Sequence, residues 1–256
     1  MRHKDYDEFA VTIDIDWAPD IAIDKTAKTL IDNNVKCTWY ITHTSPAITR
    51  LIENKELFEC GIHPNFLANS SHGETVDEVL KYISSIVPDA KSVRSHALVS
   101  SSHILAKLRD HFDIETDTTL FLQETPDLKP HLRRFREGGK DLLRFPYFWE
   151  DDTETINPEK SWSLKSAKYQ QKGLKIMNFH PMYIYLNCDT MAGYEDLKKI
   201  KLLPTLTKED MESYINQGAG AGTFFEELVG YIDKSQKGSH TIEELSRDWY
   251  SYQEKV

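Results

Sequence analysis

The stretch EFAVTIDIDW, residues 8–17, joins an apolar run to two acids. Its β-branched and aromatic residues predict a strand from Glu8 to Asp16. A stretch typical of an amphipathic helix follows to about Asn33, and the same order of strand and helix recurs along the chain. Alternating strands and helices predict a parallel sheet, either open or closed into a barrel.

Six further strands and several helices continue this pattern. The strands are expected at residues 37–42, 58–63, 92–97, 112–116, 142–149 and 174–179. Helices are expected at residues 75–86, 102–111, 224–232 and 241–249, two of them with a capping box, Thr75 with Glu78 and Thr241 with Glu244. Residues 125–141 carry Pro, Gly-Gly and scattered charge, which predicts a loop. Because 256 residues suit one barrel-sized domain, we expect a single domain over residues 1–256.

The composition excludes several classes of partner. The chain has 31 Lys and Arg against 41 Asp and Glu, a formal net charge of −10. Nucleic acids and anionic membrane surfaces are recognised by positive charge, so neither is expected as a partner. The N-terminal residues contain no apolar signal segment, and no stretch approaches the roughly 18 apolar residues of a membrane span. We therefore expect a cytoplasmic protein.

The three cysteines, Cys37, Cys60 and Cys188, are odd in number and form no CxxC pair. We expect reduced thiols rather than disulfides or a thiolate zinc site. The chain also lacks GxGxxG, GxxxxGK[ST], GxSxG and HExxH motifs, which disfavours nucleotide binding, serine hydrolysis and helical metalloprotease chemistry. The glycines of Gly218 to Gly222 precede a helix and indicate a flexible lead-in rather than an anion site.

Polar residues that can do chemistry lie at the ends of the predicted strands. They are Asp14, Asp16, His43, His63, Arg94, His96, Glu150, Asp151 and His180. Because the carboxyl ends of parallel strands share one face of the fold, these side chains are expected to meet there.

Asp14 and Asp16 are the first candidates for an active site. Two acids at i and i+2 of a strand point to the same face, where a cation or a shared proton relieves their repulsion. Alternatively, the chain leaves strand geometry here and the acids diverge. Either arrangement suits one metal ligand and one base. The competing interpretation is a solvated strand end or a helix cap.

His63 ends an apolar strand and precedes a proline. A single histidine at a strand end is more often structural, but the acid pair at another strand end favours a metal ligand. A catalytic zinc site has three protein ligands and an open position. Asp16 and His63 supply two, and the third remains open between His72 and His96.

Arg94 and His180 complete the set. A charged arginine inside a strand needs a partner, and Asp14 is the nearest by architecture, unless the side chain points outward. His180 follows the apolar run LKIMNF and can titrate near neutral pH, which suits a general acid, although a structural histidine would need only a backbone partner. Glu150 or Asp151 could bond to it and raise its pKa.

In their order and spacing, these motifs resemble the polysaccharide deacetylase family, also called the NodB-homology or carbohydrate esterase family 4 group. The similar segments are Thr12-Ile-Asp14-Ile-Asp16, Cys37-Thr38-Trp39-Tyr40, Gly61-Ile62-His63, Arg94 and Asn178-Phe179-His180. The strings HPNF, RSHAL and FHPMYIYLN are most similar to a divergent, WbmS-like branch associated with lipopolysaccharide O-antigen gene clusters.

The resemblance implies a distorted (β/α) barrel of about seven parallel strands, in the α/β class. It implies a metal-dependent hydrolase that removes N-acetyl groups from an amino sugar in a glycan or its precursor. Asp14 would be the base, Asp16 and His63 ligands of a divalent ion, Arg94 the residue that orients Asp14, and His180 the acid. Zinc is the first expectation for the ion, with cobalt, nickel or manganese as alternatives.

The chain departs from the family at one metal ligand. The family has H-x-x-x-H, but Leu67 stands four residues after His63. His72 or His96 is expected to replace the second histidine, with Asn65 as a further candidate. Two other functions stay open: a metal amidohydrolase acting on a small non-sugar amide, and a degenerate barrel that binds glycan without cleaving it.

Overall fold

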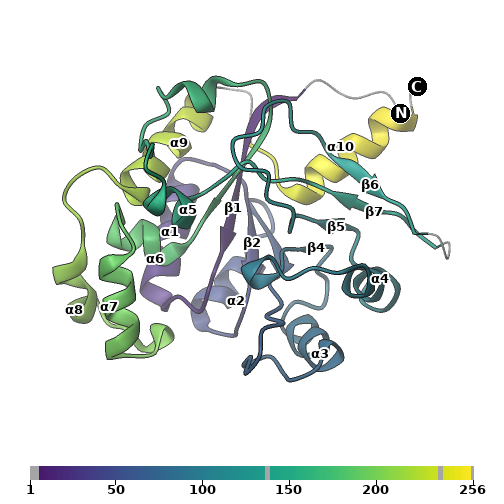
Figure 1. The fold of residues 1–256 in the computed structure, drawn as a ribbon, viewed down its shortest axis with the longest axis horizontal. Coiled ribbons are helices and arrows are strands. Elements are labelled where there is room, and N and C mark those ends of the chain that lie inside the picture. The colour runs from purple at the N-terminus through teal and green to yellow at the C-terminus, as the bar shows by residue number, and fades with distance from the viewer. Residues whose placement is uncertain (1–5, 136–138, 236–238, 255–256) are drawn as a thin grey trace.

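The computed structural model describes residues 6–135, 139–235 and 239–254. Within these residues, nine strands form one sheet in the order β6-β7-β5-β4-β3-β2-β1-β9-β8. Neighbouring strands are parallel except for β6 and β7, which are antiparallel. The sheet curls into a half-barrel with helices around it (Figure 1). The predicted distorted α/β barrel is therefore confirmed, but the predicted number of about seven strands is wrong.

The elements have the following bounds. The strands are β1 (Asp7–Asp14), β2 (Cys37–Ile41), β3 (Phe58–Ile62), β4 (Ser92–Val93), β5 (Thr116–Asp117), β6 (His131–Arg133), β7 (Leu142–Arg144), β8 (Trp149–Glu150) and β9 (Gly173–Phe179). The helices are α1 (Asp20–Asp32), α2 (Pro46–Glu53), α3 (Val76–Ile86), α4 (Ser102–His111), α5 (Asp151–Ile156), α6 (Pro181–Leu186), α7 (Ala192–Ile200), α8 (Lys208–Met211), α9 (Ala221–Ser235) and α10 (Ile242–Glu254). None of the helices in the described ranges is long and apolar enough to span a membrane.

The two extra strands arise where the sequence pattern was ambiguous. The strand expected at residues 142–149 is divided into β7 and β8 around Pro146, which lacks a backbone N–H for a continuous ladder. The edge strand β6 lies in the segment expected to be a loop, and it pairs with β7. Its three residues are polar or half-exposed, so no apolar alternation marks it.

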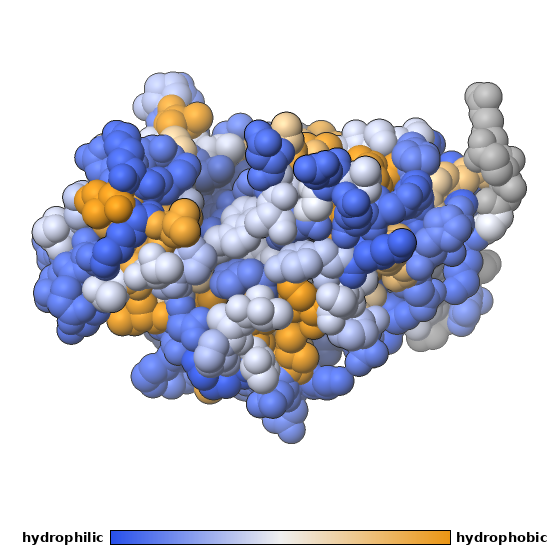
Figure 2. Space-filling model, turned by 90° about the horizontal axis from the view of Figure 1, so that it is seen from below, coloured by the Kyte–Doolittle hydropathy of each residue, from blue (hydrophilic) through white to orange (hydrophobic). Residues whose placement is uncertain are grey.

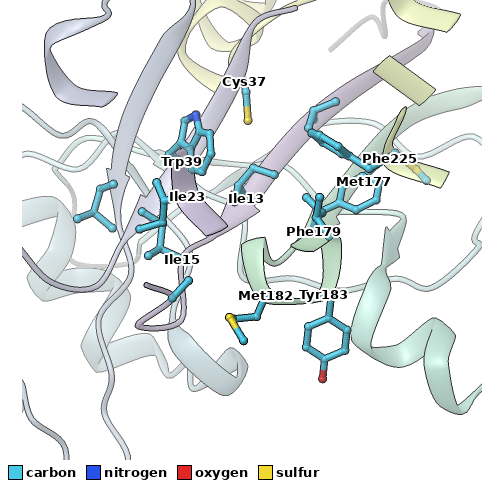
Figure 3. Close-up of a cluster of buried hydrophobic side chains, with 14 of the residues drawn as sticks. Ile13, Ile15, Ile23, Cys37, Trp39, Met177, Phe179, Met182, Tyr183 and Phe225 are labelled. Atoms are coloured by element: carbon cyan, nitrogen blue, oxygen red, sulfur yellow. The ribbon is translucent and has the colours of Figure 1, made fainter. Parts of the chain in front are cut away.

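The hydrophobic core lies between the sheet and its surrounding helices. Ile13, Met177 and Phe179 project from neighbouring strands toward Ile23 of α1 and Phe225 of α9 (Figure 3). Because side chains alternate along a strand, the residues between them point to the inside of the half-barrel. That inner face is buried and only partly apolar. A second apolar cluster there includes Ala10 and Ile176 and packs against Ile242 and Trp249 of α10. The polar residues of the inner face are Thr12, Asp14, Thr38, Glu59, Ser92, Arg94 and Asn178.

One end of this polar interior holds the start of the C-terminal helix. Glu59 accepts hydrogen bonds from Thr38 Oγ1 at 2.8 Å, Ser92 Oγ at 2.5 Å and the Glu243 N–H at 2.8 Å. Thr38 Oγ1 in turn accepts from the Ile242 N–H at 2.9 Å. The first N–H groups of a helix lack partners within the helix. Side chains of β2 and β3 therefore supply the partners that fix α10 against the half-barrel.

Glu59 predicts a pH dependence of stability. Burial raises its pKa, more than the hydrogen bonds from Ser92, the Glu243 N–H and Thr38 lower it. A raised pKa in the folded state stabilises the fold below the unfolded pKa of about 4.3, and this contribution is lost as the pH rises through the folded value. We expect the stability of the wild type to fall relative to that of Glu59→Gln as the pH rises above the unfolded pKa of about 4.3.

Urea unfolding at each pH measures this difference. Glu56→Gln, at an exposed position before β3, is the matched control and should follow the wild type. Identical pH profiles for Glu59→Gln and the wild type would contradict the prediction.

Candidate metal centre and active site

The two acids after β1 diverge because the chain leaves strand geometry between them. The Ile15 N–H still bonds to the Tyr40 carbonyl at 3.2 Å, but Asp16 and Trp17 then take left-handed backbone angles, with φ of 44° and 57°. Asp14 thus points into the half-barrel interior, whereas the turn carries Asp16 toward two histidines. This is the second of the two arrangements considered for the pair.

Asp16, His63 and His96 converge on one point. Asp16 Oδ1 lies 3.1 Å from His63 Nε2 and 3.1 Å from His96 Nδ1. One donor atom from each residue falls within 4.8 Å of the others. Burial alone would raise the pKa of Asp16, but hydrogen bonds from His63 and His96 hold this pKa well below its usual range. A carboxylate and two imidazoles are a donor set that binds divalent transition metals.

The turns that carry Asp16 and His96 both have left-handed backbone angles. His96 opens a 3-10 turn (His96–Leu98) in which Ala97 and Leu98 have φ of 50° and 56°. Left-handed angles cost about 1–2 kcal/mol in residues other than glycine, and such strain gathers at functional sites. The Trp17 ring lies edge-on to the His96 ring, 5.2 Å between centroids, so the two strained turns contact each other.

His72 lies outside the converging group. Its Nδ1 accepts the Asn65 N–H at 3.1 Å, and its ring lies 5.0 Å from Tyr82 and 5.5 Å from Trp17. Burial lowers its pKa to about 4. The Asn65 side chain is also turned toward its own loop, because Oδ1 accepts the Leu67 N–H at 3.0 Å. Of the three candidates for the missing ligand, the geometry favours His96.

Arg94 points into the interior, next to Asp14. Its guanidinium Nη1 lies 3.2 Å from Asp14 Oδ1 and donates to Thr12 Oγ1 at 2.8 Å, and Nε donates to the Thr118 carbonyl at 3.2 Å. The guanidinium lies 4.8 Å from the ring centroid of Tyr40 and 4.4 Å from that of Tyr147. Arg94 is fully buried, so the ion pair with Asp14 is shielded from solvent.

His180 is held by Asp151 at the start of α5. Its Nδ1 lies 2.6 Å from Asp151 Oδ1, and its backbone N–H donates to Asp151 Oδ2 at 2.8 Å. Burial alone would lower the pKa of His180, but the Asp151 carboxylate outweighs this effect and raises that pKa well above its usual value. His180 Nε2 faces the metal-ligand group, 3.8 Å from Asp16 Oδ2.

Three contributors to the site, Thr12, Tyr147 and Asn178, were missed in the sequence. Asn178 Nδ2 donates to Asp14 Oδ2 at 2.9 Å and to Glu150 Oε1 at 2.8 Å. Spacing is the signal that could have found Thr12 and Asn178. Thr12 stands two residues before Asp14, and Asn178 two before His180, each therefore on the same strand face as its functional neighbour.

The face that carries these residues is open to solvent in part. β1 runs downward from the N-terminus in Figure 1, so Figure 2, seen from below, faces the ends of the parallel strands. Polar residues cover most of this face, and apolar ones reach the surface among them. Leu67, which stands four residues after His63, is 45% exposed, and its side chain offers no metal ligand.

Comparison with known families assigns the chain. Residues 11–198 match a family described as WbmS-like polysaccharide deacetylase. The chain belongs to this family. The matched residues begin within β1 and end within α7, so they include Asp14, Asp16, His63, His96 and His180.

Two solved structures are similar to the chain. A Bordetella bronchiseptica protein, described as a polysaccharide deacetylase involved in O-antigen biosynthesis, is 30% identical, with a TM-score of 0.77, over 88% of this chain and 90% of that one. The peptidoglycan deacetylase PdaC of Bacillus subtilis is 11% identical, with a TM-score of 0.53, over 98% and 95%, which shows a shared fold. No curated protein matches the chain significantly.

The geometry predicts which histidine binds metal in this deacetylase-family protein. We expect His96→Ala to lower the affinity for Zn²⁺ or Co²⁺ more than about a hundredfold, because removing even a supporting residue of a metal site costs about ten- to a hundredfold. His72→Ala should keep wild-type affinity, since His72 bonds to its own loop. Isothermal titration of metal-free protein measures both, and the reverse order would refute the assignment.

Proposed function

We propose that this protein is a metal-dependent hydrolase that removes N-acetyl groups from an amino sugar in a glycan or glycan precursor. The observation that carries the proposal is a base, an acid and a metal-ligand group gathered at one strand-end face. Asp14 and His180 are both near this group: Asp14 Oδ1 lies 3.8 Å from His63 Nδ1, and His180 Nε2 lies 3.8 Å from Asp16 Oδ2.

The residues present fit a divalent metal ion. Asp16, His63 and His96 offer one oxygen and two nitrogens, and the two ring nitrogens approach the same carboxylate oxygen. Catalytic zinc sites use three such ligands and leave a position for water or substrate. The ion would supply Lewis-acid polarisation and would lower the pKa of water. Zinc is our first choice, and cobalt, nickel and manganese accept the same donors.

Asp14 would act as the base. Arg94 compensates its charge within the buried interior, and the side chain is fixed by Arg94 and Asn178 together. A fixed carboxylate next to the metal-ligand group can accept the proton of an attacking water molecule. General-base catalysis of this kind contributes about 10²–10⁴-fold to a rate.

His180 would act as the acid. Asp151 holds its Nδ1, so Nε2 is the nitrogen that faces the site. The Asp151 carboxylate keeps the imidazole protonated, because it raises the pKa of His180 despite the burial. The protonated ring can donate from Nε2 to the departing sugar amine. A barrel that only bound glycan would have no need of a paired base and acid.

The sugar substrate is the more specific part of the proposal. The similar Bordetella protein is described as involved in O-antigen biosynthesis. We propose that the substrate is an N-acetylated amino sugar of such a surface polysaccharide or of its precursor. The net charge of −10 fits a neutral acetylated substrate that becomes cationic on deacetylation.

The assignment of the base predicts a separation of activity from metal binding. Asp14→Asn should lower deacetylation by at least about 10²-fold, since general-base catalysis is lost. It should still bind one metal ion per chain, because Asp14 is not among the three converging ligands. Acetate release from N-acetylated amino sugars and elemental analysis measure the two properties.

Asp89→Asn, on the exposed segment between α3 and β4, is the control and should match the wild type in both assays. Full activity in metal-loaded Asp14→Asn protein would overturn the role of Asp14. Activity of the wild type on small cyclic amides, but not on acetylated sugars, would favour the non-sugar amidohydrolase.

A further inference from the structure

The base carboxylate is held at both of its oxygens. Arg94 Nη1 approaches Asp14 Oδ1 at 3.2 Å, and Asn178 Nδ2 donates to Asp14 Oδ2 at 2.9 Å. Arg94 Nη1 also donates to Asn178 Oδ1. The three side chains therefore form a closed ring of contacts, and no member can rotate without breaking contacts with the other two.

The orientation of the Asn178 amide follows from its donors. Thr12 Oγ1 donates to Asn178 Oδ1 at 3.0 Å, next to the bond from Arg94. With two donors on the oxygen, the amide nitrogen must face the acids. The parallel register of β1 and β9 places Thr12 directly opposite Asn178, so the backbone itself sets this geometry.

Glu150 is the second acceptor of the Asn178 amide. Its Oε1 accepts from Nδ2 at 2.8 Å, and the Tyr147 hydroxyl donates to Oε2 at 3.1 Å. Glu150 is 7% exposed, and β8 places it opposite Asn178 in the sheet. Both of its oxygens are therefore occupied by side chains of the half-barrel interior.

We propose that Asn178 is a positioning residue for the base Asp14, and that Glu150, which accepts a hydrogen bond from the Asn178 amide, holds Asn178 in place. This inference rests on the proposed deacetylase function. It gives a role to Asn178 and Glu150, two buried polar residues that take no direct part in the proposed reaction. Neither group touches the metal-ligand residues, so both act through Asp14.

The charge state of Glu150 fits this role. Burial, with the nearby Asp152 carboxylate as a smaller cause, raises the pKa of Glu150 to about 8. A neutral acid next to Asp14 avoids the repulsion that two buried carboxylates would suffer. A glutamine has the same shape and is neutral at every pH, which provides a conservative replacement.

A second cation at this place is disfavoured by the same contacts. Asp14, Glu150 and His180 also have ligand atoms within 4.8 Å of one another. However, the Asn178 amide nitrogen bonds to both acids and presents hydrogens where a cation would have to bind. The Asn178 amide, rather than a cation, therefore joins Asp14 and Glu150.

Kinetics of four variants test the proposal. We expect Asn178→Leu to lower kcat roughly a hundredfold with little change in KM, because a misplacement of about 1 Å can have that effect on a reacting group. Glu150→Leu should lower kcat in the same way, whereas Glu150→Gln should restore most of it. The double variant Asn178→Leu/Glu150→Leu should be no slower than Asn178→Leu, since Glu150 acts through Asn178.

An inactive Glu150→Gln protein, or losses that multiply in the double variant, would overturn the role of Glu150. Unchanged kcat in Asn178→Leu would overturn the role of Asn178. Asn178→Ser, which removes the amide but stays polar, provides the same test if the leucine variant does not fold.

Crystal structures separate this inference from the proposed function. In Asn178→Leu, Asp14 should adopt a second rotamer, and in Glu150→Leu the Asn178 amide should rotate, whether or not any sugar is deacetylated. An Asp14 side chain that keeps its position in both variants would refute the positioning role. A wild type that deacetylates nothing, with Asp14 displaced as expected, would refute the proposed function alone.

Discussion

Arg94 carries a positive charge into the interior of the half-barrel, and the ion pair that it forms with Asp14 determines how the surrounding residues are arranged. A buried ion pair is stable only when further hydrogen bonds satisfy both charged groups. Thr12, Asn178 and the Thr118 carbonyl supply such bonds to Nη1 and Nε, two tyrosine rings cover the guanidinium, and Nη2 has no hydrogen-bond partner among the described residues. The polar groups around Arg94 on the inner face of the sheet therefore hold the Asp14 carboxylate in a fixed position.

The sheet determines which residues meet, and the loops determine how. Parallel strands bring Asp14, His63 and His180 to one face, because β1, β3 and β9 all end there. The strained turns at Asp16–Trp17 and Ala97–Leu98 then direct a carboxylate and an imidazole to the same point as His63. The turn at His96 thus offers a replacement for the histidine that the family places four residues after His63.

The sequence was sufficient for the alternation of strands and helices, the capping boxes at Thr75 and Thr241, and the gathering of Asp14, His63 and His180, since these depend on local pattern and on parallel topology. It could not choose between His72 and His96, because left-handed angles at Ala97 and Leu98 carry no glycine signal. It also missed Asn178, whose contact with Asp14 depends on the register between strands 164 residues apart in the chain.

The central claim is that Asp16, His63 and His96 hold one divalent ion. Crystals grown with Zn²⁺ or Co²⁺, with diffraction recorded at the absorption edge of the metal, test it most directly. We expect one strong anomalous peak, with the Asp16 oxygen and the two imidazole nitrogens at about 2.0–2.2 Å. A peak elsewhere, or a saturated crystal without a peak between these three side chains, would contradict the account.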